Sequence, residues 1–199
     1  MKKHLLTALT LLTCTAALAA PCSTTTDEKS PTPLMYSARA GDTKNVRCLL
    51  ENGADPNAAA RGERAGITAL MLAVQEDHTD IVRLLIDKGA NVNAAATGGE
   101  YAGLTALIVA AQDGYTDVAR LLIDKGANVN AVITGGENAG ATALMFAAQS
   151  GHTDIVRALL DKGANPNAAD KKGWTPLMFA AKEGHTAIVQ MLKAAGAKE

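Results

Sequence analysis

The chain has 199 residues, of which 48% are hydrophobic and only 3% aromatic, and its formal net charge at pH 7 is −1. A near-neutral chain without a Lys/Arg run has no bulk attraction for nucleic acid or for an anionic membrane, so we expect neither as a partner. A core this poor in rings has to be built from closely packed Leu, Ile, Val, Met and Ala, which is typical of thin, stacked helical hairpins.

The N-terminus has the pattern of a cleavable signal peptide. Lys2 and Lys3 precede an apolar stretch at 5–12, which is too short for a membrane span, and 17–19 reads Ala-Leu-Ala, the small-x-small pattern of a cleavage site. We expect residues 1–19 to be removed and the chain to reach the bacterial periplasm or to be secreted. The alternative is that this stretch forms a buried N-terminal helix.

Residues 20–31 are rich in Thr, Ser and Pro and predict a flexible linker. Cleavage would leave Cys22 and Cys48, and an oxidising compartment would permit a disulfide between them, which the sequence leaves open. We interpret Cys48 as a small buried apolar residue, because the matching positions of the later repeats hold Leu, Ala or Met. A lipid anchor is less favoured, because neither Cys14 nor Cys22 follows the small residue that lipoprotein processing prefers.

From Thr32 onward the chain repeats itself. A Thr-x-Leu triplet recurs with its leucines 36, 37, 37 and 33 residues apart, and a Gly-Ala pair follows each leucine by 19 residues in all five copies. The helical body of each repeat is therefore constant, and only the connections vary in length. The expected repeats are about 32–58, 59–94, 95–131, 132–168 and 169–199.

The third repeat shows the local logic. Thr105 is a natural N-cap for a short first helix at 106–111. Gly114 supplies the left-handed residue that ends this helix. A second helix begins near Thr116, shows apolar residues at i, i+3 and i+4, and ends near Lys125, where a positive charge is favourable.

The order of these signals resembles the ankyrin repeat family over residues 32–199. The fourth repeat carries the family pattern as Gly140-Ala141-Thr142-Ala143-Leu144-Met145-Phe146-Ala147-Ala148, Gly151-His152, Ile155-Val156, Leu159-Leu160 and Gly163-Ala164-Asn165-Pro166-Asn167. The resemblance implies an all-α solenoid of five helix-turn-helix repeats whose connections form β-hairpin or loop fingers. It also implies a non-catalytic scaffold that binds another protein along its concave face.

The sequence departs from the family pattern in three ways. Met or Ile replaces the usual His after Thr-Pro-Leu in every copy, which predicts a more adaptable joint. Asp77 replaces the Gly expected before His78, and Asp tolerates the left-handed conformation better than most residues. Three connections are longer than usual and carry a related motif, at 61–66, 98–103 and 135–140.

Insertions in a solenoid map to one face, which is often the binding face. The best candidates vary from finger to finger while their neighbours stay fixed, and the finger glutamates stand beside them. The resemblance implies that the glutamines near the ends of the first helices line the concave groove. The predicted partner-binding residues are Arg64, Tyr101, Asn138, Trp174, Glu63, Glu100, Glu137, Gln75, Gln112 and Gln149. Trp174, the only tryptophan, either anchors a partner or seals the gap to the fourth repeat.

We expect no catalytic residues, no metal, no cofactor and a monomer. His78, His152 and His185 share one register and are separated by whole repeats, so no two can bind one metal, and the resemblance gives them a structural role. The sequence holds neither a P-loop nor a dinucleotide motif. Two alternatives remain open: an inhibitor or immunity protein of an exported enzyme or toxin, and a metal or anion binder that uses the Gly-Gly-Glu fingers.

Overall fold

A computed structural model describes residues 32–198. These residues form ten α-helices and two short 3₁₀ helices, and the described range contains no β-strand. The helices are α1 (Pro33–Ala40), α2 (Thr43–Glu51), α3 (Ala69–Gln75), α4 (Thr79–Asp87), α5 (Ala106–Asp113), α6 (Thr116–Asp124), α7 (Ala143–Ser150), α8 (Thr153–Asp161), α9 (Pro176–Lys182) and α10 (Thr186–Ala194), with η1 (Gly62–Arg64) and η2 (Gly99–Tyr101) in the first two long connections.

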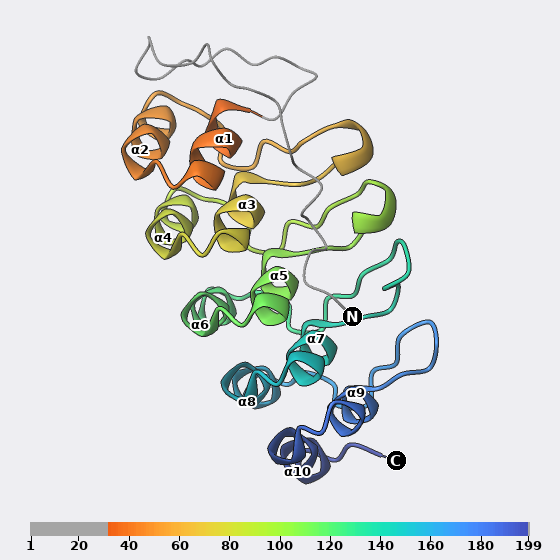
Figure 1. The fold of residues 1–199 in the computed structure, drawn as a ribbon. Coiled ribbons are helices and arrows are strands. Elements are labelled where there is room, and N and C mark those ends of the chain that lie inside the picture. Colours follow the sequence, from red (N-terminus) through yellow and green to blue (C-terminus); the bar gives the residue numbers. More distant parts are fainter. Residues whose placement is uncertain (1–31, 199) are drawn as a thin grey trace.

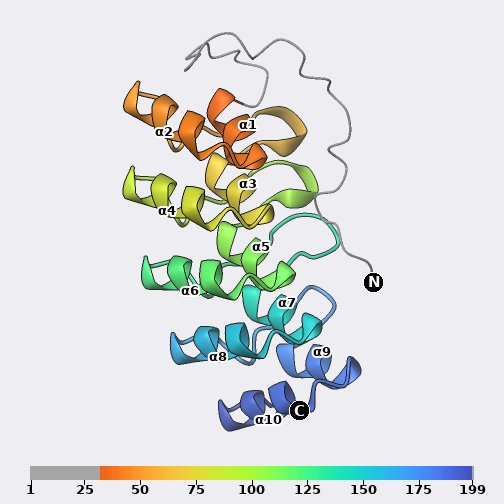
Figure 2. The same cartoon turned by 60° about the vertical axis from the view of Figure 1, so that its left-hand side comes forward.

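The helices are stacked as five antiparallel pairs. In Figure 1 the odd-numbered helices form an inner row, the even-numbered helices form an outer row, and the connecting loops project from the inner side. Figure 2 shows the same five layers from another direction, with each pair lying on the next. This arrangement is the all-α repeat solenoid that the sequence predicts.

Threonine side chains begin all five inner helices. In α5, for example, the Thr105 hydroxyl accepts a hydrogen bond from the backbone N–H of Ile108 at 3.4 Å, which satisfies an otherwise free helix N-terminal donor. The equivalent caps are Thr32, Thr68, Thr142 and Thr175. Gly114 ends α5 with a φ of +82°, so the local prediction for the third repeat is confirmed at both ends of its first helix.

Small residues line the contacts between successive pairs. Ala73, Ala110, Ala147 and Ala180 have no exposed surface, and each lies on an inner helix that packs against its neighbours. Such residues let the inner helices approach closely, while Leu, Ile and Val fill the space between the inner and outer rows. The chain therefore buries a continuous core without large rings, because each layer is thin.

Asparagines link the base of each connection to the next repeat. The side-chain amide of Asn93 donates to the carbonyl oxygen of Gly126 at 3.0 Å, and its Oδ1 accepts from the backbone N–H of Asn128 at 2.7 Å. The same pair of bonds recurs at Asn57, Asn130 and Asn167. Each bridge spans two repeats, so the ladder fixes the spacing between them.

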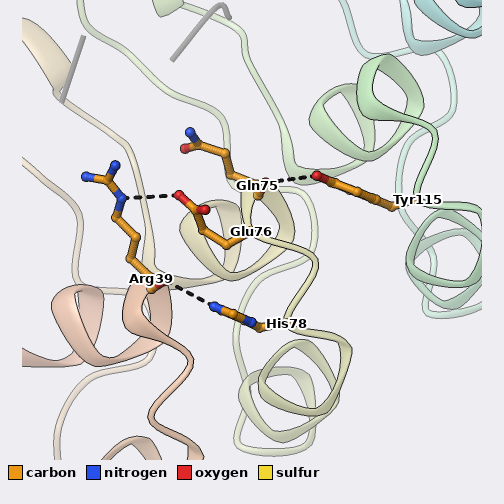
Figure 3. Close-up of polar contacts among 5 residues, drawn as sticks. All are labelled: Arg39, Gln75, Glu76, His78 and Tyr115. Carbon is orange, nitrogen blue, oxygen red and sulfur yellow. Dashed lines mark hydrogen bonds and ion pairs between the residues drawn. The ribbon is translucent and has the colours of Figure 1, made fainter. Parts of the chain in front are cut away.

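A second ladder joins the start of each outer helix to the previous repeat. His78 Nε2 lies 3.1 Å from the carbonyl oxygen of Arg39, as Figure 3 shows, and His152 and His185 make the same contact to Gln112 and Gln149. These rings occupy hydrogen-bonding positions between repeats. The structural role that the resemblance gave them is therefore confirmed.

The joint between the second and third repeats differs from the others. Tyr115 takes the ladder position there, and its hydroxyl donates to the carbonyl oxygen of Gln75 at 3.3 Å (Figure 3). Burial raises the pKa of Tyr115, and the negative charges of Asp113, Asp77 and Glu76 raise it further. The hydroxyl therefore keeps its proton at neutral pH and remains a donor.

Asp77 is the one residue other than glycine with a positive φ, +55°, among residues 32–198. It holds the position where Gly114 and Gly151 end the corresponding helices with φ near +82°. We expect Asp77→Gly to raise the free energy of unfolding by about 1 kcal/mol, because glycine adopts this conformation without a Cβ penalty. Urea denaturation followed by circular dichroism measures the change.

Asp77→Asn is the matched control, since it removes the charge and keeps a side chain that tolerates the same backbone conformation. We expect it to recover only a small part of the gain. An equal gain from both variants would show that repulsion from Glu76 and Asp113, not backbone strain, destabilises this joint.

Cys48 is half-buried on α2 and is disulfide-bonded. Our interpretation of it as a simple apolar residue was therefore incomplete. The other two cysteines, Cys14 and Cys22, lie outside the described residues, as do the predicted signal peptide at 1–19 and the linker at 20–31.

Candidate functional site

Each of the first three connections forms a finger that closes on one isolated antiparallel bridge. The bridges are Ala59 to Thr68, Ala95 to Thr105 and Val132 to Thr142. Of the two expected forms, β-hairpin or loop, the fingers are loops with a single bridge. The tips of the first two fingers are η1 and η2, whereas the third ends in an irregular turn.

Backbone hydrogen bonds stack these fingers into one layer. The carbonyl oxygen of Ala65 accepts from Thr97 N at 2.7 Å and from Gly98 N at 3.0 Å. Ala102 accepts in the same way from Thr134 and Gly135, and Ala139 accepts from Lys171 at 2.9 Å. The fingers are therefore parts of one hydrogen-bonded surface, not independent loops, and Figure 1 shows them side by side along the solenoid.

This stacking brings the predicted finger residues into repeating positions. Glu63, Glu100 and Glu137 are exposed, and they stand at equivalent places on successive tips. The variable residues beside them are half-buried: Arg64, Tyr101 and Asn138. Tyr101 packs against the edge of the hydrophobic core, so its ring is held in place and offers a partly exposed aromatic surface.

The glycines before these glutamates hold the stack together. A Cβ at Gly98 would lie 2.6 Å from Ala65 N and 2.7 Å from Glu63 O, and a Cβ at Gly135 would meet the carbonyl oxygen of Gly99. Their N–H groups already donate to the preceding finger. The N–H groups that an anion nest would need from these two positions are therefore occupied, which counts against the anion-binding alternative.

The inner helices contribute the floor of the concave face. Gln75, Gln112 and Gln149 end or nearly end α3, α5 and α7, and all three are half-buried. Their backbone carbonyls accept the inter-repeat bonds from Tyr115, His152 and His185. Sequence reasoning missed this second role, because it depends on contacts some 40 residues apart.

One ion pair crosses the same face between the first two repeats. Arg39 Nε lies 3.3 Å from Glu76 Oε1, and Figure 3 shows the Arg39 side chain reaching from α1 toward α3. Both side chains remain about one-third exposed, 30% and 38%, so solvent screens the pair and it adds little to stability.

Trp174 lies at the C-terminal end of the described solenoid. Its ring centroid is 5.2 Å from that of Phe179, with the planes tilted by 42°, and Lys182 Nζ lies 5.3 Å from the centre of the tryptophan ring. The Trp174 backbone N–H donates to Asp170 Oδ1 at 2.8 Å. Both of these ring contacts are with residues of its own repeat, and the side chain is half-buried.

The sequence did not single out Met178. The residues in its register are Met35, Met71, Ile108 and Met145, all at most 2% exposed, whereas Met178 is 44% exposed. In the first four repeats the next helical pair covers this position, and no further pair of the described structure covers Met178. The position of Met178 in the last repeat could have predicted its exposure. Comparing residue types between repeats does not reveal it, because Met occurs at the buried positions as well.

Two hollows of about 650 and 700 Å³ lie at the bases of neighbouring fingers. Small residues and asparagines line them, and Arg61 is the only charged lining residue. The Thr68 and Thr105 hydroxyls in their walls already cap helices. Neither hollow contains a paired acid and base.

Two further properties concern residues 32–198. No group of three or more His, Cys, Asp or Glu side chains there is placed to hold a metal ion. None of the helices in this range combines the length and apolarity needed to cross a membrane.

The stacked helical pairs and the layer of fingers define a helical-repeat solenoid, a class of protein that presents an extended binding surface on a rigid scaffold. Comparison with protein families matches the family described as "Ankyrin repeats (3 copies)" at residues 3–96, 34–133 and 132–198. The chain belongs to the ankyrin repeat family, and its repeats indicate a protein–protein interaction module. No curated protein matches the chain.

Proposed function

We propose that this chain is a non-catalytic scaffold of the bacterial periplasm that binds a partner protein through its concave face and fingers. The observation that supports this most is the hydrogen-bonded stack of three long fingers. Stacking holds Arg64, Tyr101 and Asn138 at regular spacing while their identity changes from finger to finger. A rigid surface with variable positions suits the recognition of one partner, because little conformational entropy is lost on binding.

The periplasmic location rests on the pattern of residues 1–19 alone. Within that compartment, inhibition of an exported enzyme or toxin would use the same surface, so the identity of the partner separates an inhibitor from an accessory scaffold. The occupied N–H groups of Gly98 and Gly135 make the anion-binding alternative less favoured.

We expect Tyr101→Ala and Trp174→Ala to weaken capture of the partner at least about tenfold each, since partly exposed aromatic side chains dominate such interfaces. The measurement is a pull-down of the mature chain from a periplasmic extract, with each bound protein quantified by mass spectrometry. Lys88→Ala is the control, because Lys88 is exposed beyond α4 in the outer row.

Circular dichroism of each variant checks that the solenoid is intact. A stoichiometric partner that is retained by both aromatic variants would contradict the proposed surface. Loss with Lys88→Ala as well would place binding on the outer row of helices.

A further inference from the structure

The exposed face of the last helical pair combines apolar and basic residues. Trp174 packs on Phe179, Lys182 covers the tryptophan ring at 5.3 Å, and Met178 is 44% exposed. Met178 and Lys182 are four residues apart on α9, so they share one side of that helix. We call this group of Trp174, Met178, Phe179 and Lys182 the terminal patch.

Two of these positions are buried wherever another repeat follows. The counterparts of Trp174 are Ile67, Leu104 and Ala141, which are at most 6% exposed, and the counterparts of Met178 are equally buried. The first repeat differs at the opposite end: Ser37 and Asn45 replace apolar residues there, and they hydrogen-bond each other at 2.7 Å. The N-terminal pair thus carries polar substitutions at its interface positions, whereas the C-terminal pair keeps apolar ones.

Charge is distributed unevenly along the solenoid. Residues 170–199 carry five Lys against Asp170, Glu183 and Glu199, whereas residues 32–169 carry eleven Lys or Arg against fifteen Asp or Glu. All five lysines are exposed: Lys171, Lys172, Lys182, Lys193 and Lys198. An acidic segment of the partner would therefore be attracted to this end and kept away from the finger tips, which carry Glu63, Glu100 and Glu137.

We propose that the terminal patch anchors an acidic peptide segment of the partner, with one apolar side chain packed on Trp174 and Met178. The carboxylates of that segment lie beside the lysines of the last repeat. A second copy of this chain fits less well, because two such ends would bring their lysines together. This inference rests on the proposed function, since it assigns the chemistry of the segment that the scaffold holds.

Trp174 is the only tryptophan of the chain, so its fluorescence reports on this patch without a label. The probe is a synthetic acidic peptide of Asp and Glu with one central leucine, titrated into the full chain at low salt. We expect a saturable change in Trp174 emission that weakens as salt is added. A peptide with serine in place of leucine, and one with Lys in place of the acidic residues, should each bind at least about tenfold more weakly.

Two variants test the assignment of residues. Lys182→Glu should weaken binding of the acidic peptide at least about tenfold, whereas Lys88→Glu, the same charge change on the outer row, should leave it within about twofold. Circular dichroism confirms that both variants are folded. Equal affinity for the acidic and basic peptides, or no change in emission with the acidic one, would overturn the proposal.

Anionic phospholipid vesicles form the last arm of the test. A Trp174 response to vesicles without a response to the acidic peptide would overturn the proposal in favour of a lipid surface. The outcomes for the two proposals can be distinguished. Binding of the acidic peptide without capture of any protein would support the terminal patch and contradict the proposed scaffold function. Capture of a partner through Tyr101 without binding of the peptide would support the scaffold function and overturn the proposal for the terminal patch.

Discussion

Leu107→Ala should destabilise the solenoid by roughly 2–5 kcal/mol, the range for removing a buried leucine side chain. Leu107 is 1% exposed on α5, in the central helical pair. A repeat contacts only its neighbours, so a loss in the middle weakens the coupling between both ends of the array. The expected result is a lower urea midpoint and a broader transition.

Two signals recorded on the same sample make this test sharper. Circular dichroism follows all helices, while Trp174 fluorescence follows the last repeat. We expect the two curves to coincide for the parent chain and to separate for Leu107→Ala, because uncoupled ends unfold independently. Leu121→Ala on α6 is the control: this leucine is only partly buried, and its truncation should cost less. An unchanged midpoint for Leu107→Ala would contradict the assigned core.

Gly103→Ala should be the most damaging single change in the fingers. Gly103 has a φ of +84°, and a Cβ there would lie 2.6 Å from the backbone nitrogen of Thr134 and would press on the carbonyl oxygen of Val132. Those atoms belong to the next finger, so the two fingers must separate to make room. We expect a loss of roughly 2–5 kcal/mol, the sum of left-handed strain and overpacking against rigid backbone.

Gly126→Ala is the matched control, with a φ of +85° and no atom within 4 Å of the added Cβ. It carries the same backbone penalty without the collision, about 1–2 kcal/mol. The difference between the two midpoints therefore measures how firmly the fingers are stacked. Equal losses would mean that the fingers move apart freely and do not form a rigid surface.

Much of the scaffold could be predicted from the sequence because its determinants are local. The threonine caps, the glycine at 114 and the period of apolar residues each act within one helix or turn. Self-alignment then placed these units in register, and Asp77 stood out as a departure whose left-handed backbone the structure confirms. The sequence repeat predicts the helices and their register because each repeat must bury the same face.

The tertiary structure alone decided how the repeats act on one another. The carbonyl of Ala65 accepts from residues more than 30 positions away, which gives the glycines of the Gly-Gly-Glu motif a packing role. Tyr115 occupies a position that is held by histidine at the other joints between repeats. Its role is visible only in the structure, where its hydroxyl donates to the carbonyl oxygen of Gln75.

The same limit explains Trp174 and Met178. Their residue types fit the buried register, and their exposure follows only from the absence of a covering pair in the described structure. The sequence by itself thus determined the repeat, its caps and its helices, because those depend on near neighbours. The exposure of a surface depends on packing by residues that are distant in the sequence, so only the tertiary structure determined it.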